Sequence, residues 1–332
     1  MATRARVPAG LAILETLLTG LGPGGPSADD RETFVRLLRD SSALVVARTA
    51  HAMRELELRE MLPELEEAAE RCLTRTARQD PGCIAKLALF RTLYDLECAR
   101  AALYRDALAV RQYEPVWGGR VDAAAGLRAI AGQGLTLCDD AGRVDLLAEL
   151  LADPEPEARA GALQALGACG DPAALPLLRY LCLCESTDTD TRRAAMVAIL
   201  ALGGDDEIAF VARSLDQERP ALLQAAALAL CESGLAAALA PVIQLLEGDL
   251  DQDQRELLCL ALAGSGLAPG RDWLLQRLMQ GRRGEALDAL HALHALRDDH
   301  GLCVQVADAI AVRAETALEL EWRLLFRDAE DE

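Results

Sequence analysis

The sequence predicts an all-α fold: a right-handed α-solenoid (superhelix) of about seven helix pairs, interrupted by one irregular insert. Two observations lead to this fold class. First, the apolar residues are mostly alanine, leucine and valine, and aromatic residues make up only 3% of the 332 residues. Small and straight-chain side chains favour helices and allow close contact between them. Second, the chain repeats itself, which is typical of stacked units.

Four stretches of the chain can be aligned, and each contains a helix rich in alanine and leucine, a turn with glycine and a second amphipathic helix. They cover residues 158–181, 191–215, 221–246 and 254–278. The turn glycines, 34, 30 and 32 residues apart, are Gly170, Gly204, Gly234 and Gly266. Glycine is expected there because a left-handed backbone ends such helices. One helix pair cannot bury its apolar face alone, so the pairs must stack.

The ends of the helices in a unit can also be predicted. Asp171-Pro172 indicates a helix start, because Asp is a strong N-cap and Pro suits the first helical position. This pattern resembles the HEAT repeat, in the bacterial HEAT-like form with a GDPxAL turn. The resemblance is clearest over residues 145–280 and weaker over 29–108. It implies a stack of helix pairs, so we expect helices throughout and no sheet.

The regular pattern divides the chain into three parts. Residues 1–79 are predicted to form N-terminal HEAT-like helices, and residues 135–332 regular HEAT-like repeats with a C-terminal capping helix. Between them, residues 80–134 break the period and form an irregular helical insert.

The insert carries two distinctive motifs, DPGCIAK at 80–86 and EPVWGGR at 114–120. The first contains Lys86, the only lysine of the chain, and the second contains Trp117, the first of three tryptophans. The motifs resemble a set of bacterial HEAT-repeat proteins that share a DPGCxAK…QxEPVWGGxxDxAxxLR pattern. The resemblance implies the same fold and no particular reaction.

A structural interpretation of the insert makes residues 111–119 a loop between helices, because Pro115 and the following glycines break regular structure. Trp117 would then be buried in a seam between the two repeat arrays. Lys86 would contact an acid, with Glu114 as the first choice.

A functional interpretation places the same charges around a pocket for an anionic group or a peptide terminus. Arg120 would start the next helix, and Asp122 and Arg128 would lie on it. The candidate binding residues are Lys86, Glu114, Trp117, Arg120, Asp122 and Arg128. The structural interpretation is favoured, since buried ion pairs at irregular joints commonly hold architecture.

The charge of the chain excludes one class of partner. The formal net charge is −19, and no basic stripe that could displace counterions from nucleic-acid phosphates is present. This also argues against the basic concave face of HEAT-like DNA glycosylases. An acidic surface keeps a protein soluble or suits a basic partner.

The ten cysteines are scattered singly, which predicts neither a zinc site nor a disulfide framework. They are typical of small buried side chains in a reducing compartment, and no apolar stretch is long enough to span a membrane. We therefore expect a cytoplasmic protein.

Enzymatic roles have little support in the sequence. The deoxyhypusine hydroxylases, which have HEAT-like repeats, bind two irons through His-Glu dipeptides, and none of the four histidines here precedes a glutamate. His291 and His294, at i and i+3, are weak metal candidates because no third ligand is evident. No Walker loop, GxSxG or HExxH motif is present. No cofactor and no metal are expected.

The sequence thus predicts a non-catalytic interaction scaffold or adaptor built from HEAT-like repeats. Its partner would be another protein, for which basic character suits the acidic charge, or a larger bacterial assembly. The alternative is a ligand- or chromophore-handling protein, similar to the phycobilin lyases, that uses the insert as its pocket.

Overall fold

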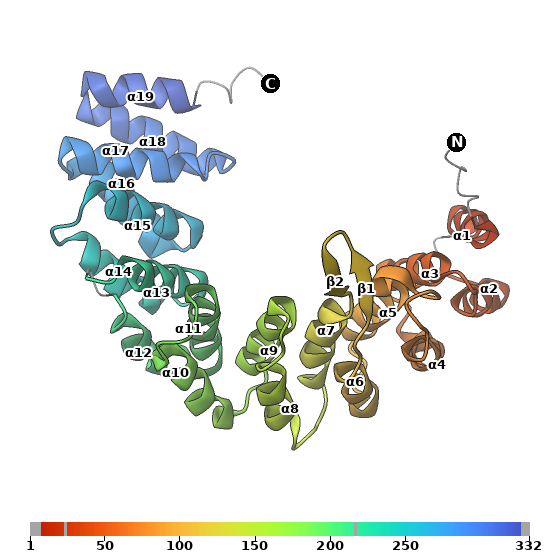
Figure 1. Cartoon of the computed structure of the whole chain (residues 1–332). Helices are drawn as coiled ribbons and strands as arrows, with labels where there is room; N and C mark the ends of the chain where they lie inside the picture. Colours follow the sequence, from red (N-terminus) through yellow and green to blue (C-terminus); the bar gives the residue numbers. More distant parts are fainter. Residues whose placement is uncertain (1–7, 23–24, 216–217, 327–332) are drawn as a thin grey trace. The chain divides into compact units, whose positions relative to one another are not determined.

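The computed structural model describes residues 8–22, 25–215 and 218–326. By its internal contacts the chain divides into two compact units, Met1–Asp171 and Pro172–Glu332. Both units consist of consecutive helices that pack in rows, and each unit is described by itself (Figure 1).

In the first unit, alternate helices pack side by side. Its α-helices are α1 (Ala9–Gly20), α2 (Ala28–Leu38), α3 (Ala43–Glu55), α4 (Leu62–Leu73), α5 (Ile84–Asp95), α6 (Ala101–Leu108), α7 (Ala125–Leu135), α8 (Arg143–Leu150) and α9 (Pro156–Ala168). Short 3-10 turns, η1 (Arg59–Met61) and η2 (Pro81–Cys83), precede α4 and α5. Helices α3, α5, α7 and α9 follow one another in one row, and α2, α4 and α6 form a second row behind them.

One apolar core runs through this unit from Leu14 in α1 to Cys138 after α7. Its largest members include Phe90 and Tyr104, whose rings meet edge to face with centroids 6.0 Å apart. The core continues across residue 80, so the predicted insert packs with the N-terminal helices. The predicted three-part division stays a prediction, and the contacts divide the chain after Asp171.

The second unit repeats the same layout. Its α-helices are α10 (Leu175–Leu183), α11 (Thr189–Gly203), α12 (Ile208–Ala212), α13 (Pro220–Glu232), α14 (Leu239–Leu246), α15 (Gln252–Gly264), α16 (Ala268–Gln280), α17 (Arg283–His294), α18 (His300–Arg313) and α19 (Thr316–Phe326). The 3-10 turns η3 (Pro172–Ala174), η4 (Gly204–Glu207) and η5 (Ala236–Ala238) precede α10, α12 and α14. Helices α11, α13, α15, α17 and α19 form one row, and α14, α16 and α18 form the other.

The turns of the repeat are confirmed at the residues that the sequence indicated. The four turn glycines have positive φ angles of 67°, 61°, 73° and 67°, in the order Gly170, Gly204, Gly234 and Gly266. A side chain is strained in this region, which explains why glycine recurs at this position of the four aligned repeats. The all-α solenoid predicted from the sequence is therefore the fold of this protein.

One element was not predicted. Residues Tyr113–Val116 (β1) and Gly119–Asp122 (β2) form an antiparallel hairpin, so the expectation of no sheet is wrong. The pairing joins Tyr113 to Asp122 and Val116 to Gly119. Gly118 has a φ of 91°, as the second central residue of a type II turn requires. The loop predicted over 111–119 is therefore a turn of two residues between two short strands.

None of the helices among the described residues combines the length and the apolar character that crossing a bilayer demands.

Candidate functional site

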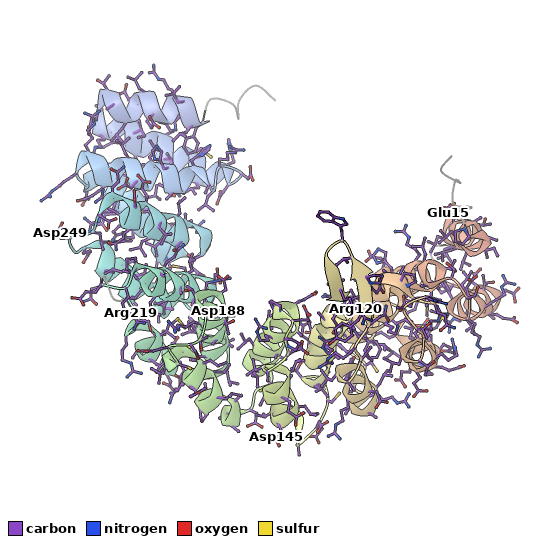
Figure 2. The ribbon with its side chains drawn as sticks, viewed as in Figure 1. Glu15, Arg120, Asp145, Asp188, Arg219 and Asp249 are labelled. Carbon is purple, nitrogen blue, oxygen red and sulfur yellow. The ribbon has the colours of Figure 1, made fainter. Side chains whose placement is uncertain are left out.

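The hairpin projects from the row of helices in the first unit, between α6 and α7 in the chain (Figure 1). Most of its side chains are open to solvent. Trp117 at the turn is fully exposed, with a relative exposed area of 105%, and Tyr113 and Val116 are half exposed. Arg120 on β2, labelled in Figure 2, lies over the Tyr113 ring at 5.7 Å from its centroid. The hairpin therefore presents an aromatic and apolar surface, with Trp117 at its tip, that nothing in the described structure covers.

The base of the hairpin contrasts with its tip, because it is held by buried charged groups. Lys86 on α5 is 1% exposed, and its Nζ donates hydrogen bonds to Asp80 Oδ2 at 3.2 Å and to Gln112 Oε1 at 2.8 Å. The Asp80 carboxylate also accepts from the backbone N–H groups of Ala85 and Lys86, and so caps the start of α5. Each charge of this buried pair compensates the other. Removing one of the two side chains would therefore leave an uncompensated charge inside the protein.

Gln112 and Glu114 join this pair to β1. Gln112 Nε2 donates to the carbonyl oxygen of Asp80 and to Glu114 Oε1, both at 2.7 Å. Glu114 Oε1 also accepts from the backbone N–H of Gly82, at 2.8 Å. The first strand is thereby attached to the turn that precedes α5.

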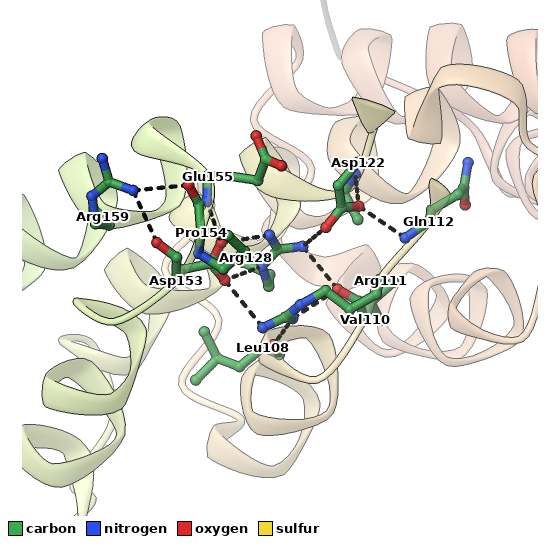
Figure 3. A network of polar contacts seen from close by, with 11 residues as sticks. Leu108, Val110, Arg111, Gln112, Asp122, Arg128, Asp153, Pro154, Glu155 and Arg159 are labelled. Atoms are coloured by element: carbon green, nitrogen blue, oxygen red, sulfur yellow. Dashed lines mark hydrogen bonds and ion pairs between the residues drawn. The ribbon is translucent and has the colours of Figure 1, made fainter. Parts of the chain in front are cut away.

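A second buried cluster holds the other strand, and Figure 3 shows its contacts. Arg128 on α7 has an exposed fraction of 0%, and it lies between the carboxylates of Asp122 and Asp153. Its Nη1 donates to Asp122 Oδ2, while Nε and Nη2 donate to the two oxygens of Asp153, all at 2.8 Å. Arg111 Nη2 adds a contact to Asp153 at 3.1 Å. The end of β2, helix α7 and the start of α9 are therefore joined through one guanidinium group.

The two clusters meet at the strand ends, where the backbone N–H of Gln112 donates to Asp122 Oδ1 at 2.9 Å. Burial raises the pKa of Asp122, but the N–H groups of Gln112 and Ala124 and the Arg128 guanidinium outweigh it and leave that pKa lowered. Asp153 behaves alike: burial opposes ionisation, and the hydrogen bonds from Arg128 lower its pKa. Both carboxylates are thus ionised over the ordinary pH range.

The structure confirms some of the sequence predictions for this region and contradicts others. Trp117 is not buried in a seam, because it lies at the tip of a hairpin rather than in a loop between helices. The contact of Lys86 with a carboxylate is confirmed, but the carboxylate is Asp80; Glu114 faces Gly82 and Gln112 instead.

Arg120 and Asp122 were expected on a helix and lie on β2, because the helix begins only at Ala125; Arg128 does lie on that helix. Lys86, Glu114, Asp122 and Arg128 come together at the hairpin base, while Trp117 and Arg120 lie on its exposed part. The grouping of all six around one pocket remains a prediction, and these contacts give it no support.

Four members of the two buried clusters were missed as site residues, namely Asp80, Arg111, Gln112 and Asp153. A signal existed for two of them, since Asp80 is the first letter of the DPGCxAK motif and Gln112 is the first letter of the QxEPVWGGxxDxAxxLR pattern. Its Gln, Glu, Asp and Arg letters all fall on residues of the buried clusters. Asp153 is followed by a proline, which is typical of a helix start. Nothing in the adjacent sequence indicated that Arg128 would be its partner.

Comparison with known families finds HEAT repeats over residues 120–199 and 144–231. The chain contains HEAT repeats. The matched span, 120–231, is about a third of the sequence and runs from β2 to α13. The predicted resemblance to HEAT repeats is confirmed, while membership of the group with the DPGCxAK…EPVWGG pattern stays a prediction.

Solved structures of helical repeat proteins resemble this HEAT-repeat chain at low identity. The CpcE–CpcF complex of phycocyanin lyase from a Nostoc species matches at 17% identity and a TM-score of 0.40, over 75% of this chain and 93% of its own. The Escherichia coli protein YibA matches at 16% and 0.43, over 87% and 98%. Human deoxyhypusine hydroxylase matches at 17% and 0.31, over 81% and 98%. Likenesses this distant carry no argument about activity.

No curated protein matches the HEAT-repeat sequence closely enough to count as a relative.

The two histidines singled out as weak metal candidates have protein partners in the HEAT-repeat structure. His291 Nε2 lies 2.9 Å from Glu321 Oε1, and His294 packs its ring edge to face against Phe326. Among the residues that the structure describes, no group of three or more His, Cys, Asp or Glu side chains has metal-site geometry.

Most cysteines of the HEAT-repeat chain are buried, as expected for packing residues, and all ten thiols are free. Burial raises the pKa of Cys83 to about 12, so this thiol is protonated at neutral pH. Cys184, at the end of α10, is different. Hydrogen bonds from the Ser186 side chain and backbone, and from Tyr180, lower its pKa to about 7.

Proposed function

We propose that this HEAT-repeat protein is a non-catalytic scaffold or adaptor that binds another protein, and that the tip of the hairpin is its contact element. One observation carries the proposal: Trp117 is fully exposed at a turn whose base is fixed by buried ion pairs. An exposed tryptophan adds nothing to a folded core, so the stability of the chain gives no reason for it. Tryptophan is among the residue types most enriched at interface hot spots.

The buried base supports this role because it limits the motion of the strands. Asp122 at the end of β2 is held by Arg128, and Glu114 on β1 is held by Gly82 and Gln112. A contact element that is already ordered loses little conformational entropy when it binds, and this favours affinity.

The surroundings of Trp117 suit a partner with an apolar pocket. Tyr113, Val116 and Val121 are each about half exposed, while Glu114 and Arg120 supply charge beside them. An apolar centre with polar groups around it is the usual anatomy of a protein interface.

The formal charge of −19 suits a partner of basic character, because opposite charge speeds encounter and disfavours acidic competitors. Binding would then weaken as salt is added. A cytoplasmic location and a place in a larger bacterial assembly belong to the same proposal, and free, mostly buried cysteines are compatible with a reducing compartment.

The alternative, a ligand- or chromophore-handling protein with its pocket in residues 80–134, has less support. Lys86 and Arg128, two of the three cations that such a pocket would use, are buried and donate to internal partners. The third, Arg120, lies over the Tyr113 ring on the exposed part of the hairpin. No observation favours a chromophore over a protein.

Capture of partners by two matched variants tests the proposal. The parent, Trp117→Ala and Tyr180→Ala are immobilised and exposed to a lysate of the cells that make the protein, and bound proteins are quantified by mass spectrometry. Tyr180 is another exposed aromatic residue, with an exposed fraction of 63%, in the second unit. Losing a hot spot costs about 2 kcal/mol or more, so Trp117→Ala should retain about thirtyfold less of the partner.

The parent and Tyr180→Ala should retain the partner equally. A set of bound proteins that is the same for the parent and Trp117→Ala would refute the hairpin tip as the contact element.

A further inference from the structure

The second unit contains a pocket of about 330 Å³ where the end of α10, helix α12 and the starts of α11 and α13 meet. Three arginines line it, namely Arg192, Arg213 and Arg219. Glu185 is the one acidic residue among the side chains that line it. A pocket lined by more basic than acidic side chains is unusual in a chain whose net charge is −19.

Arg192 on α11 is the deepest of the three, with an exposed fraction of 8%. Its Nη2 donates to the carbonyl oxygens of Cys184 and Thr187, at 2.8 and 3.1 Å, and its buried Nε has no partner. Within the described part of the chain, no carboxylate forms an ion pair with it. A buried charge is normally paired, so this guanidinium lacks a counter-charge that a bound anion would supply.

Arg213 and Arg219 lie at the exposed side of the pocket. The Arg213 guanidinium packs over the Phe210 ring, 4.7 Å from its centroid, which orients its plane and leaves its N–H edges available. Arg219 directly precedes Pro220 at the start of α13, labelled in Figure 2. The positive end of that helix dipole adds to the same field. Neither arginine forms an ion pair with a carboxylate among the described residues.

Other clustered arginines in this unit are neutralised. Arg179, which also lies against Phe210, pairs with the buried carboxylate of Glu207, and Arg193 pairs with Glu232. The three pocket arginines differ from them in having no such partner.

We propose that this pocket binds an oxyanion, a phosphate or a carboxylate, between Arg213 and Arg219 and above Arg192. Guanidinium groups present paired N–H donors that match the oxygens of both anions. Leu183, Phe210 and Leu222 form an apolar part of the wall, next to Cys182 and Ser214, so the natural ligand carries an apolar group beside its oxyanion. This site is separate from the hairpin, and the inference does not depend on the scaffold role.

Isothermal titration of the full chain with inorganic phosphate, and separately with acetate, tests the site. Saturable binding is expected at millimolar concentrations or below. Tighter binding of phosphate would identify the natural ligand as a phosphate ester, and comparable binding of acetate would identify a carboxylate such as an acidic side chain or a peptide terminus. The absence of saturable binding of either anion would overturn the proposal.

Variants determine whether the bound anion occupies this pocket. Arg213→Ala and Arg219→Ala should each weaken binding by about tenfold, because each removes a charge-assisted contact from an exposed side chain. Glu185→Gln removes the one opposing carboxylate and should strengthen binding. Arg323→Ala, an exposed arginine on α19 that does not line the pocket, should change nothing.

An unchanged affinity in both Arg213→Ala and Arg219→Ala would refute the site even if the chain binds phosphate. Arg192 is left intact in these variants because its hydrogen bonds hold the loop between α10 and α11. Circular dichroism spectra that match the parent show that a loss of binding is not a loss of folding.

Discussion

At the scale of single residues, Arg128 is a charged side chain with no exposed surface, and its position has a consequence for stability. Its guanidinium is compensated by Asp122 and Asp153, whose own pKa values it lowers. Removing either carboxylate would leave a buried charge with incomplete pairing, which costs about 3–5 kcal/mol. The network therefore stabilises the folded chain only while both acids are ionised.

Lowering the pH should reduce the stability of the protein, because it protonates these two carboxylates. A carboxylate with a lowered folded pKa contributes stability above its unfolded pKa, about 3.9, and that contribution is lost as the pH falls through the folded value. We expect the melting temperature to be steady above about pH 5 and to fall below about pH 4. In Asp122→Asn, which is less stable at neutral pH, this acid-dependent fall should be smaller than in the parent.

Asp145→Asn, a change at an exposed site on α8 labelled in Figure 2, serves as the control and should follow the parent curve. An Asp122→Asn curve with the full acid-dependent fall would show that this carboxylate is not the titrating group.

Cys184 provides a second residue-scale prediction. Because its pKa is lowered to about 7 whereas burial raises that of Cys182 to about 12, Cys184 should be alkylated first by iodoacetamide at neutral pH. Mass spectrometry of the modified peptides measures this order. Ser186→Ala removes the first cause of the lowered pKa and should slow the reaction; an equal rate in that variant would disprove the assigned cause.

At the scale of elements, α7 and α9 pack against each other so closely that their backbones meet at Gly161 and Ala129. A Cβ atom added to Gly161 on α9 would come within 2.5 Å of the Ala129 Cα on α7. Since that atom belongs to the backbone, only a shift of a whole helix could relieve the clash. Gly161→Ala should therefore destabilise the protein by about 1–3 kcal/mol in urea denaturation.

Gly264→Ala is the matched control, since Gly264 ends α15 and an added Cβ would meet no atom within 4 Å. Alanine favours helix over glycine, so this variant should be stabilised by about 0.5 kcal/mol. Opposite signs for the two substitutions are the expected result, and equal signs would contradict the packing described for α7 and α9.

The elements differ in how far the sequence could predict them. Helices of the repeat were predictable because each has its own apolar face and a glycine at its turn, as at Gly204 and Gly234. The hairpin was not, because Pro115 and the adjacent glycines are equally typical of a loop. The strand ends are held by contacts that the sequence does not reveal, because Gln112 binds Asp80, 32 residues away, and the Arg128 that holds Asp122 is itself paired with Asp153, 25 residues away.

At the scale of the whole molecule, the polar contacts between successive repeats could not be predicted from the sequence either. From the sequence alone, Arg255 cannot be told apart from a residue on the exposed face of its helix. In the structure its Nε donates to the nearly buried Asp288 on α17, which joins α15 to the next repeat. Removing Arg255 would leave a buried carboxylate without its partner. Such pairs depend on the register of the stack, which a single sequence does not reveal.

We infer that the base of the hairpin stabilises the fold, while its tip contributes nothing to folding and is open for a partner. The melting temperatures of Trp117→Ala and Lys86→Met test this claim most directly. Lys86→Met leaves the buried Asp80 carboxylate unpaired, at a cost of about 3–5 kcal/mol, and should lower the melting temperature by many degrees. Trp117→Ala removes a fully exposed side chain and should melt like the parent and like Arg323→Ala. A melting temperature lowered as much by Trp117→Ala as by Lys86→Met, or unchanged in Lys86→Met, would contradict the claim.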